Sequence, residues 1–341
     1  MLHAQLPERA IDSLMARYAH PGGPGASLLV VRDEQVALAK SYGLANVERH
    51  EAVTPETDFR LASLSKQFTA TAVMLLAADG KLRYDDPIAS LLPGLPAYVR
   101  GVTVRHLLDH TSGLPDYERF VPDTQTRQVH DAEIPALLAR DSALAFAPGT
   151  RYAYSNSGYV LLALLVERLG GRPFPDFLRA RVFAPLGMAH TVAHVEGRDV
   201  VPERAYGYSV RGGVRRTDQS NTSATLGDGG IYASAADLAR WDAALERHAL
   251  VSAEAQRLAW TPPAIAGGPD GPFAGAGYGF GWFVDTDRGT TRLRHHGESR
   301  GFTNAVVRYP ERRLAVWVLT NRSGGAPWDV AQRIADRYLG R

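Results

Sequence analysis

The sequence predicts an α/β (α+β) fold, in which an antiparallel sheet is flanked by helices and carries an inserted all-helical domain. Three observations predict it: strand-like runs near the start, a middle block of helical periodicity broken by Pro and Gly, and strand-like runs that return near the end. We therefore expect a discontinuous sheet domain of residues 1–62 and 226–341 and a mainly helical domain of residues 63–225, with an active site at their interface. With 341 residues, 45% of them hydrophobic, the chain can bury a large core.

The N-terminal part is expected to form one helix and a β-hairpin. The helix rests on four apolar residues at helical spacing, Ile11, Leu14, Met15 and Tyr18. The hairpin rests on two runs rich in strand-forming residues, 26–32 and 35–42, which are separated only by Asp33-Glu34.

The middle and C-terminal parts are expected to differ in kind. Helices are predicted in the middle over residues 63–78, 131–139 and 158–169, with Asp79-Gly80 and Gly170-Gly171 as end signals. Strands are predicted over residues 278–284, 291–295, 302–308 and 314–320, followed by a helix marked by Val330, Ile334 and Tyr338. Residues 261–277, rich in Pro, Gly and Ala, are expected to form a surface loop.

The composition excludes several classes of function. The formal net charge is +2 and no basic block occurs, so nucleic acid is not an expected partner. The chain has no cysteine, which excludes thiol catalysis and disulfides. Its longest apolar run, residues 160–166, is far shorter than the roughly 20 residues of a membrane helix, so membrane insertion is not expected. The N-terminus lacks a basic start followed by an apolar run, so the cytoplasm is the expected compartment unless a leader was trimmed.

A serine is followed three residues later by a lysine at the start of the first middle helix. Ser63 and Lys66 share a helix face, so the amine can reach the hydroxyl, as in the S-x-x-K pattern of acyl-enzyme hydrolases. Only three lysines occur among 38 Lys and Arg residues. A desolvated lysine can act as a base, whereas arginine cannot, so Lys66 is informative. By itself, the pattern leaves a chance pairing open.

A second motif, Tyr154-Ser155-Asn156, precedes the long apolar helix. A tyrosine can relay a proton when a nearby cation lowers its pKa, and an asparagine can hold a substrate amide. The alternative is that Ser155 or Asn156 only caps the helix.

A third motif, His295-His296-Gly297 followed by Glu298, lies at the end of a predicted strand. A strand edge with a glycine can present a backbone N–H to an oxyanion, together with the N–H of Ser63.

In this order and spacing, the three motifs resemble those of the penicillin-recognising serine hydrolases. The resemblance is greatest to the class C β-lactamase-like branch, which includes D-alanyl-D-alanine carboxypeptidases, D-aminopeptidases and family VIII esterases. Residues 107–114, 227–238 and 278–282 share it, so that it covers nearly the whole chain. It implies a β-lactamase/transpeptidase-like fold and no metal or organic cofactor.

The resemblance also implies roles for the motif residues. Ser63 attacks the substrate carbonyl, and Lys66 and Tyr154 share its proton and later protonate the leaving group. Asn156 orients the substrate. The backbone N–H groups of Ser63 and Glu298 form the oxyanion hole.

Two departures from the family pattern bear on the substrate. His295-His296-Gly297 stands where Lys-Thr-Gly is usual, and the bulky Glu298 stands where Gly or Ser is common. A neutral His295 attracts a substrate carboxylate less than lysine does, and the attraction should return as the pH falls. We therefore expect short-chain esters, or amides without a free carboxylate, to be the better substrates, unless Arg294 or Arg300 points into the site.

The expected function is a serine hydrolase that acts through an acyl-enzyme on a small-molecule carboxylic ester or amide, with an ester favoured. The alternatives are a D-amino-acid peptidase or carboxypeptidase, a β-lactamase, and a non-catalytic acyl-binding or sensor protein on the same fold. The sequence leaves the oligomeric state open.

Two rival sites are weaker. Residues 297–301 match the G-x-S-x-G nucleophile elbow, but no histidine follows His296, and a strand rather than the required helix is predicted after Ser299. Two histidine pairs have the spacing of helical metal ligands, but neither has a glutamate in the H-E-x-x-H position or an evident third ligand. These pairs are His106 with His110, and His190 with His194. For His110, hydrogen bonds within its own loop are expected instead of metal binding.

Overall fold

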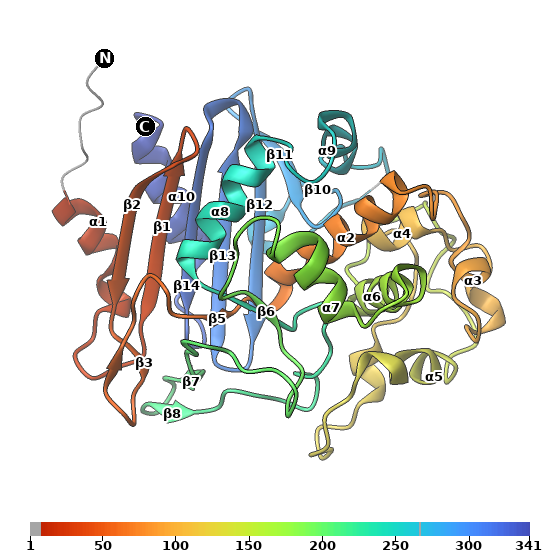
Figure 1. Cartoon of the computed structure of the whole chain (residues 1–341), viewed down its shortest axis with the longest axis horizontal. Coiled ribbons are helices and arrows are strands. Elements are labelled where there is room, and N and C mark those ends of the chain that lie inside the picture. The colour runs from red at the N-terminus through yellow and green to blue at the C-terminus, as the bar shows by residue number, and fades with distance from the viewer. Residues whose placement is uncertain (1–7, 266) are drawn as a thin grey trace.

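A seven-stranded antiparallel sheet lies at the centre of the computed structural model, which describes residues 8–265 and 267–341. The strand order is β10-β11-β12-β13-β14-β1-β2, so that the first and last strands of the chain lie side by side (Figure 1). The strands are β1 (Ala26–Arg32), β2 (Gln35–Tyr42), β10 (Gly277–Tyr278), β11 (Phe283–Asp287), β12 (Thr290–Ser299), β13 (Phe302–Tyr309) and β14 (Leu314–Thr320).

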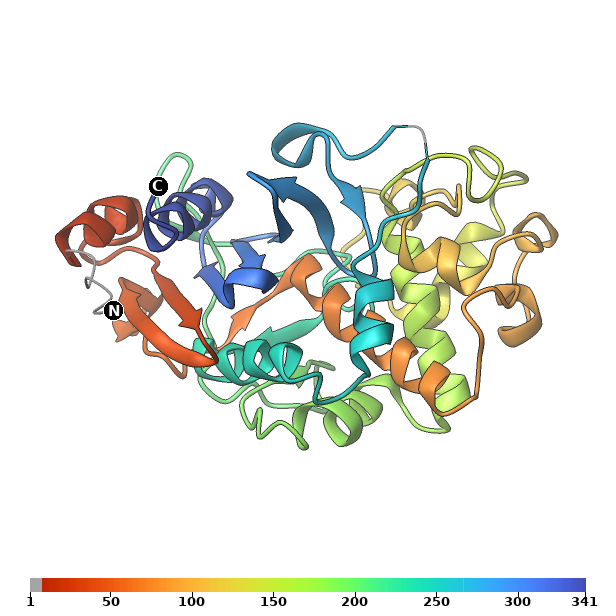
Figure 2. The ribbon, with the colours of Figure 1, turned by 90° about the horizontal axis from the view of Figure 1, so that it is seen from above.

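Helices cover both faces of the sheet, as Figure 2 shows from above. Leu28 and Val30 of β1 belong to the core beneath the terminal helices, whereas Leu29 and Val31 belong to the larger core on the other face. Successive side chains of a strand point to opposite faces, which explains why β1 is an uninterrupted apolar run. The covering helices are α1 (Glu8–Met15) and α10 (Pro327–Tyr338) on the first face and α8 (Ala235–Glu246) on the second.

In the block between the first hairpin and β9 (Ile231–Ala233), most of the regular structure is helical. The apolar helices α2 and α6 pack together there, and both contribute to the larger core. The helices are α2 (Lys66–Ala78), α3 (Ile88–Leu91), α4 (Val104–Leu108), α5 (Ile134–Leu138), α6 (Asn156–Gly170) and α7 (Phe174–Leu178), and α9 (Ala253–Ala259) follows later. Three short sheets complete the fold: β3 (Leu44–Asn46) with β4 (Glu51–Ala52), β5 (Phe59–Arg60) with β9 (Ile231–Ala233) and β6 (Val192–Ala193), and β7 (Tyr208–Ser209) with β8 (Arg215–Arg216).

Most of the elements predicted from the sequence are confirmed, and the exceptions have local causes. The predicted strand over 278–284 is interrupted between β10 and β11. Gly281 there has a φ of 82°, and a Cβ at this position would lie 2.9 Å from the Cα of Gln67. The chain therefore bends across the start of α2 at a place that only glycine fits.

The division into two domains stays a prediction. The sheet β5-β9-β6 contains residues from both expected parts, because β9 pairs with β5 on one side and with β6 on the other. The long apolar helix predicted in the middle is α6. Within residues 8–265 and 267–341, no helix is both long enough and apolar enough to span a bilayer.

Candidate active site

The turn before α2 carries Ser63. It is the 3-10 turn Ala62–Ser65, and its first residue, Ala62, has a φ of 50°. This left-handed conformation is unfavourable for alanine, so surrounding contacts must hold it. One such contact is the hydroxyl of Ser65, which accepts a hydrogen bond from the N–H of Ile231 at 3.2 Å.

Lys66 is the first residue of α2, and its side chain is fully buried. Its Nζ lies 3.0 Å from Ser63 Oγ, 2.8 Å from Asn156 Oδ1 and 2.9 Å from the carbonyl oxygen of Asp228. The last two oxygens are acceptors only, so they can take both protons of a neutral amine. The nitrogen lone pair is then left for the hydroxyl proton of Ser63, as a general base requires.

The charge of Lys66 is also adapted to this role. Burial lowers the pKa of Lys66 to about 8, against the opposing influence of Asp228, Asp116 and Glu118. About one such lysine in ten is then neutral at pH 7, whereas an ordinary lysine is neutral in fewer than about one in a thousand. Burial therefore supplies a usable base near neutral pH.

Tyr154 lies beside the lysine, with its ring centroid 4.9 Å from Lys66 Nζ. Its phenol oxygen is buried and has no hydrogen-bond partner in the part of the chain that the structure describes. Burial raises the pKa of Tyr154 well above its usual value, although the nearby Ser63 hydroxyl partly opposes this. The condition named for a proton relay, a pKa lowered by a nearby cation, is therefore not met. Tyr154 is a neutral phenol that can donate a proton.

Asn156 is held at both ends of its amide. Its Oδ1 accepts from Lys66, and its Nδ2 donates to Glu118 Oε1 at 3.3 Å. Its backbone N–H donates to Asp116 Oδ2 at 3.0 Å. The carboxyl group of Asp116 thus accepts a hydrogen bond from the first backbone N–H of α6, whereas the Ser155 side chain forms no capping hydrogen bond. The capping alternative is therefore wrong for both residues, because the Asn156 side chain faces the lysine.

His295 lies behind the site rather than in it. It is fully buried, its Nδ1 lies 2.6 Å from the carbonyl oxygen of His296, and its Nε2 lies 2.9 Å from the hydroxyl of Tyr278. The carbonyl requires Nδ1 to be protonated, so Nε2 accepts from the tyrosine. Burial and the neighbouring His296 and Lys66 hold the pKa of His295 well below its ordinary value. The expectation that His295 regains charge as the pH falls toward 6 is wrong.

The other residues of the third motif lie next to the serine turn. A Cβ at Gly297 would lie 2.0 Å from the carbonyl oxygen of Leu61, so only glycine lets β12 approach the turn. Pairing between β11 and β12 stops at Arg294, which leaves this edge of residues 295–299 to the turn. An oxyanion hole formed by Glu298 and Ser63 stays a prediction.

Two clefts meet at Ser63 and Glu298. The aromatic cleft, of about 690 Å³, is lined by Tyr152, Tyr154, Phe273, Phe283 and His296 among others. The polar cleft, of about 400 Å³, is lined by Arg60, Glu118, Asn156, Asp228, Ser299 and Arg300 among others. The nucleophile candidate therefore separates an apolar surface from a charged one.

His296 shapes the aromatic cleft as a neutral ring. It stacks on Phe273 with ring centroids 4.8 Å apart. Burial, together with the charge of Lys66, lowers the pKa of His296 to about 4. It therefore adds surface and no positive charge at neutral pH.

Sequence reasoning missed three acidic residues of the site: Asp116, Glu118 and Asp228. Burial raises the pKa of Glu118 to about 7, with added effects of Asp116 and Asp228. Burial likewise raises the pKa of Asp116. Asp228 lies in a stretch that carries the family resemblance, and the two others follow such a stretch directly. The resemblance therefore marked the segments without identifying the side chains.

His110 supports Tyr154 from behind. Its Nδ1 accepts a hydrogen bond from the N–H of Ser155 at 3.2 Å, and its ring centroid lies 4.2 Å from that of Tyr154. The expected hydrogen bonds within its own loop are therefore replaced by this longer-range one. Among residues 8–265 and 267–341, no group of three or more His, Cys, Asp or Glu residues is arranged to hold a metal ion. Ser299, the serine of the possible elbow, is followed by the strand β13, as expected.

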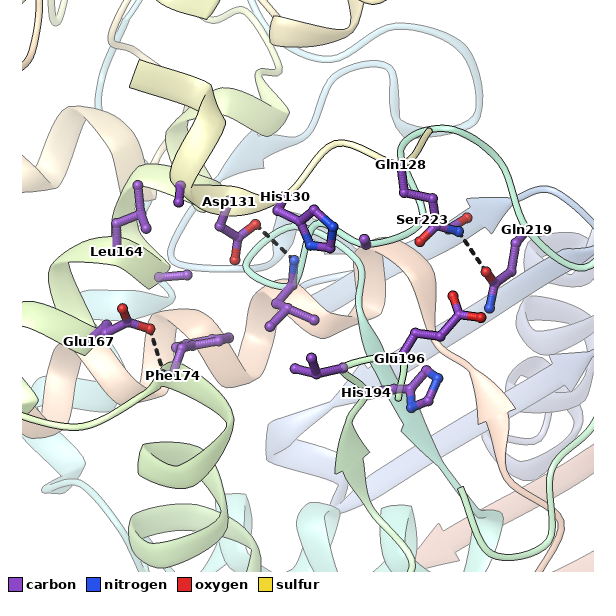
Figure 3. Close-up of a pocket in the computed structure, with 15 residues that line it drawn as sticks. Gln128, His130, Asp131, Leu164, Glu167, Phe174, His194, Glu196, Gln219 and Ser223 are labelled. Atoms are coloured by element: carbon purple, nitrogen blue, oxygen red, sulfur yellow. Dashed lines mark hydrogen bonds between the residues drawn. The ribbon is translucent and has the colours of Figure 1, made fainter. Parts of the chain in front are cut away.

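A third cavity, of about 160 Å³, adjoins the polar cleft and contains no residue of the three motifs (Figure 3). Ser223 lines both cavities. Two contacts inside it hold the intervening segment: Asp131 Oδ1 accepts from the N–H of Leu226 at 2.9 Å, and Gln128 Nε2 donates to Gln219 Oε1 at 2.6 Å. The wall of the polar cleft is thus fixed from behind.

Known proteins resemble this chain over most of its length. A family model described as Beta-lactamase matches residues 8–340. The chain is 31% identical to penicillin-binding protein 4* of Bacillus subtilis (strain 168) over 346 residues, which cover 91% of this chain and 75% of that protein. It is 30% identical to the D-aminopeptidase of Gluconobacter oxydans (strain 621H) over 347 residues, which cover 96% of this chain and 61% of that protein. The chain thus spans less than two thirds of the length of this D-aminopeptidase.

Solved structures show the same fold. The octameric penicillin-binding protein homologue from Pyrococcus abyssi superimposes with a TM-score of 0.85 and 30% identity, over 98% of this chain and 77% of that one. The D-amino acid amidase from Ochrobactrum anthropi SV3, in complex with L-phenylalanine, has a TM-score of 0.79 and 26% identity, over 98% of this chain and 97% of that one. Both match the mixed fold with its large antiparallel sheet.

Proposed function

Because the chain belongs to the beta-lactamase family and is a serine hydrolase, we propose that it cleaves amides whose acyl group carries a free amine, as an N-terminal D-amino acid does. The relatives named D-aminopeptidase and D-amino acid amidase support this amidase alternative more than the expected preference for esters. The D configuration rests on these relatives alone.

One observation carries the proposal: the cluster of Glu118, Asp116 and Asp228 beside the nucleophile. Two of these carboxyl groups, Glu118 and Asp116, have a raised pKa, because the cleft reduces their solvation and they lie close to other acids. An ammonium group in the polar cleft would supply the missing counter-charge and favour their ionised forms. A substrate amine is therefore the group that this part of the cleft fits best.

The proposed reaction begins with neutral Lys66, which takes the hydroxyl proton of Ser63 while Oγ attacks the substrate carbonyl. The tetrahedral intermediate collapses when its C–N bond breaks and the leaving nitrogen takes a proton. Tyr154 donates that proton and is reprotonated from Lys66. Water then attacks the acyl-enzyme, again with Lys66 as base, and releases the acid and Ser63.

This scheme also gives the substrate a direction. Tyr154 lines the aromatic cleft and not the polar cleft, and the leaving group must meet the group that protonates it. We therefore place the leaving amine in the aromatic cleft and the acyl residue in the polar cleft. Aromatic amides such as p-nitroanilides suit this arrangement.

The test compares kcat/KM for D-alanyl p-nitroanilide with that for its L enantiomer and its N-acetyl derivative. We expect the free D-amine to be preferred over the N-acetyl derivative by at least about tenfold, since only a free amine pairs its charge with the acidic cluster. A preference over the L enantiomer is expected from the relatives. Faster turnover of the N-acetyl compound would contradict the amine site. If nitrocefin or an N-acylated D-Ala-D-Ala peptide is the better substrate, a carboxylate-recognising function replaces this one.

A substitution in the acidic cluster isolates the amine contact. Glu118→Gln keeps an oxygen for Asn156 and removes the charge, so we expect kcat/KM for D-alanyl p-nitroanilide to fall about tenfold or more, mainly through KM. The matched control is Glu311→Gln, at an exposed position outside both clefts. An equal loss for the N-acetyl substrate would indicate a structural role instead.

A further inference from the structure

The polar cleft also contains a cationic part that the amine site does not use. Arg300 lines it with an exposed side chain and forms no ion pair with any residue that the structure describes, Glu298 included. Arg294 is different, because it pairs with Asp285 and donates to the carbonyl oxygen of Pro272 at 2.9 Å. Of the two arginines near the end of β12, Arg300 is therefore the one that lines the polar cleft.

Arg60 lines the same cleft from the short strand β5. It is only 4% exposed, yet no carboxylate pairs with it among the described residues. Its Nη2 donates to the carbonyl oxygen of Ser223 at 2.7 Å, and its buried Nε has no partner in the part of the chain described. A buried arginine without a counter-ion is costly unless an anion arrives.

Hydroxyl groups complete this part of the cleft. Ser299 Oγ is buried without a hydrogen-bond partner in the described chain, and Ser220, Thr222 and Ser323 line the same space. The segment that holds Arg60 through Ser223 is fixed from behind by the contacts in the third cavity. Guanidinium and hydroxyl donors in a fixed wall form a surface that suits an oxyanion.

We propose that Arg60, Arg300 and Ser299 form a subsite for a carboxylate carried by the acyl residue of the substrate. The proposal rests on the proposed function, and it names the substrate class: amides with an N-terminal D-aspartyl or D-glutamyl residue. The amine pairs with Glu118, which forms no ion pair with either arginine in the described chain, and the side-chain carboxylate pairs with the arginines. The polar cleft would thus bind both the amine and the side-chain carboxylate of the substrate's N-terminal residue.

The test uses two substrates that differ in charge but hardly in shape, the p-nitroanilides of D-aspartate and D-asparagine. We expect kcat/KM to favour the aspartyl substrate by at least about tenfold, because one charge-assisted arginine contact is lost with the amide. In Arg300→Gln the preference should fall at least about threefold, because Arg60 is left as the one arginine of the subsite. The control Arg211→Gln, at an exposed position outside the cleft, should keep it. A ratio near one in the wild type overturns the subsite and leaves the amine site standing.

A binding measurement separates this proposal from the catalytic one. In Ser63→Ala, calorimetric titration with free D-aspartate and D-asparagine measures the subsite without turnover. We expect D-aspartate to bind at least about tenfold more tightly than D-asparagine, and Arg300→Gln to reduce this difference at least about threefold. Equal binding of the two amino acids, or binding of inorganic phosphate alone, overturns the carboxylate subsite. If no p-nitroanilide is cleaved, the proposed function fails, and the titration still decides the subsite.

Discussion

Ser63→Ala is expected to lower kcat/KM for the best p-nitroanilide substrate by at least about ten-thousandfold, because no acyl-enzyme can form without the hydroxyl. The fold should survive, since the side chain becomes smaller and Lys66 keeps its contacts with Asn156 and the carbonyl of Asp228. An unchanged thermal unfolding midpoint would establish this. The matched control is Ser90→Ala, which removes the hydroxyl of an exposed serine that lines neither cleft.

Chemical labelling checks the same assignment independently. A fluorophosphonate probe followed by peptide mass mapping should place the adduct on Ser63 in the wild type, and no adduct should form in Ser63→Ala. An adduct on Ser112 or Ser299 with Ser63 unmodified would show that another serine is the nucleophile. If a p-nitroanilide substrate acylates Ser63 and the acyl-enzyme is never hydrolysed, the non-catalytic sensor alternative is favoured.

Lys66→Arg should reduce the acylation rate by more than about a hundredfold, the low end of what a positioned general base contributes. Arginine keeps the positive charge and cannot accept the proton of Ser63. Pre-steady-state release of p-nitroaniline measures this step. Activity within a few-fold of the wild type would mean that Lys66 contributes charge or structure only.

The pH dependence provides a second measurement on the same residue. The base must be neutral, and the pKa of Lys66 is lowered to about 8, so kcat/KM for the N-acetyl substrate, which has no titrating amine, should rise about tenfold per pH unit below pH 8 and level off above it. For the free amine, kcat/KM should fall again above about pH 8, because the substrate ammonium loses its proton there. This rising limb should be absent from Lys66→Arg. A wild-type profile that stays flat from pH 6 to pH 9 would contradict the assignment of the base.

Periodicity and turn residues predicted those parts of the molecule in which the interacting residues are close in sequence. The hairpin of β1 and β2 and the helix α10 follow from periodicity and turn residues. The bounds of the two strands are those predicted, and α10 contains the three residues that marked the closing helix. Ser63 and Lys66 meet because they lie three positions apart on a helical turn. In these cases, the side chains that interact are close in sequence as well as in space.

Residues brought together by packing were harder to predict. Glu118 reaches Asn156 only because the segment after α4 packs against the start of α6. His295 was expected to face the substrate, but it occupies a buried position of β12 and forms a hydrogen bond with Tyr278 of β10, which lies two strands away in the sheet. A sequence pattern does not reveal which face of a strand end is covered by other elements. The strand that carries His295 was therefore predicted, but the direction of its side chain was not.

The two clefts that meet at Ser63 also bear on what becomes of the acyl-enzyme. Once the first amine has left, the aromatic cleft presents the rings of Tyr152, Phe273 and Phe283 next to the ester bond. Apolar surface of this kind binds an aromatic amine in preference to water. A second amine that enters there would attack the ester and form a new amide. The same geometry that directs cleavage would therefore let the enzyme exchange one aromatic amine for another and join D-amino acids to it, in a proportion set by the amine concentration.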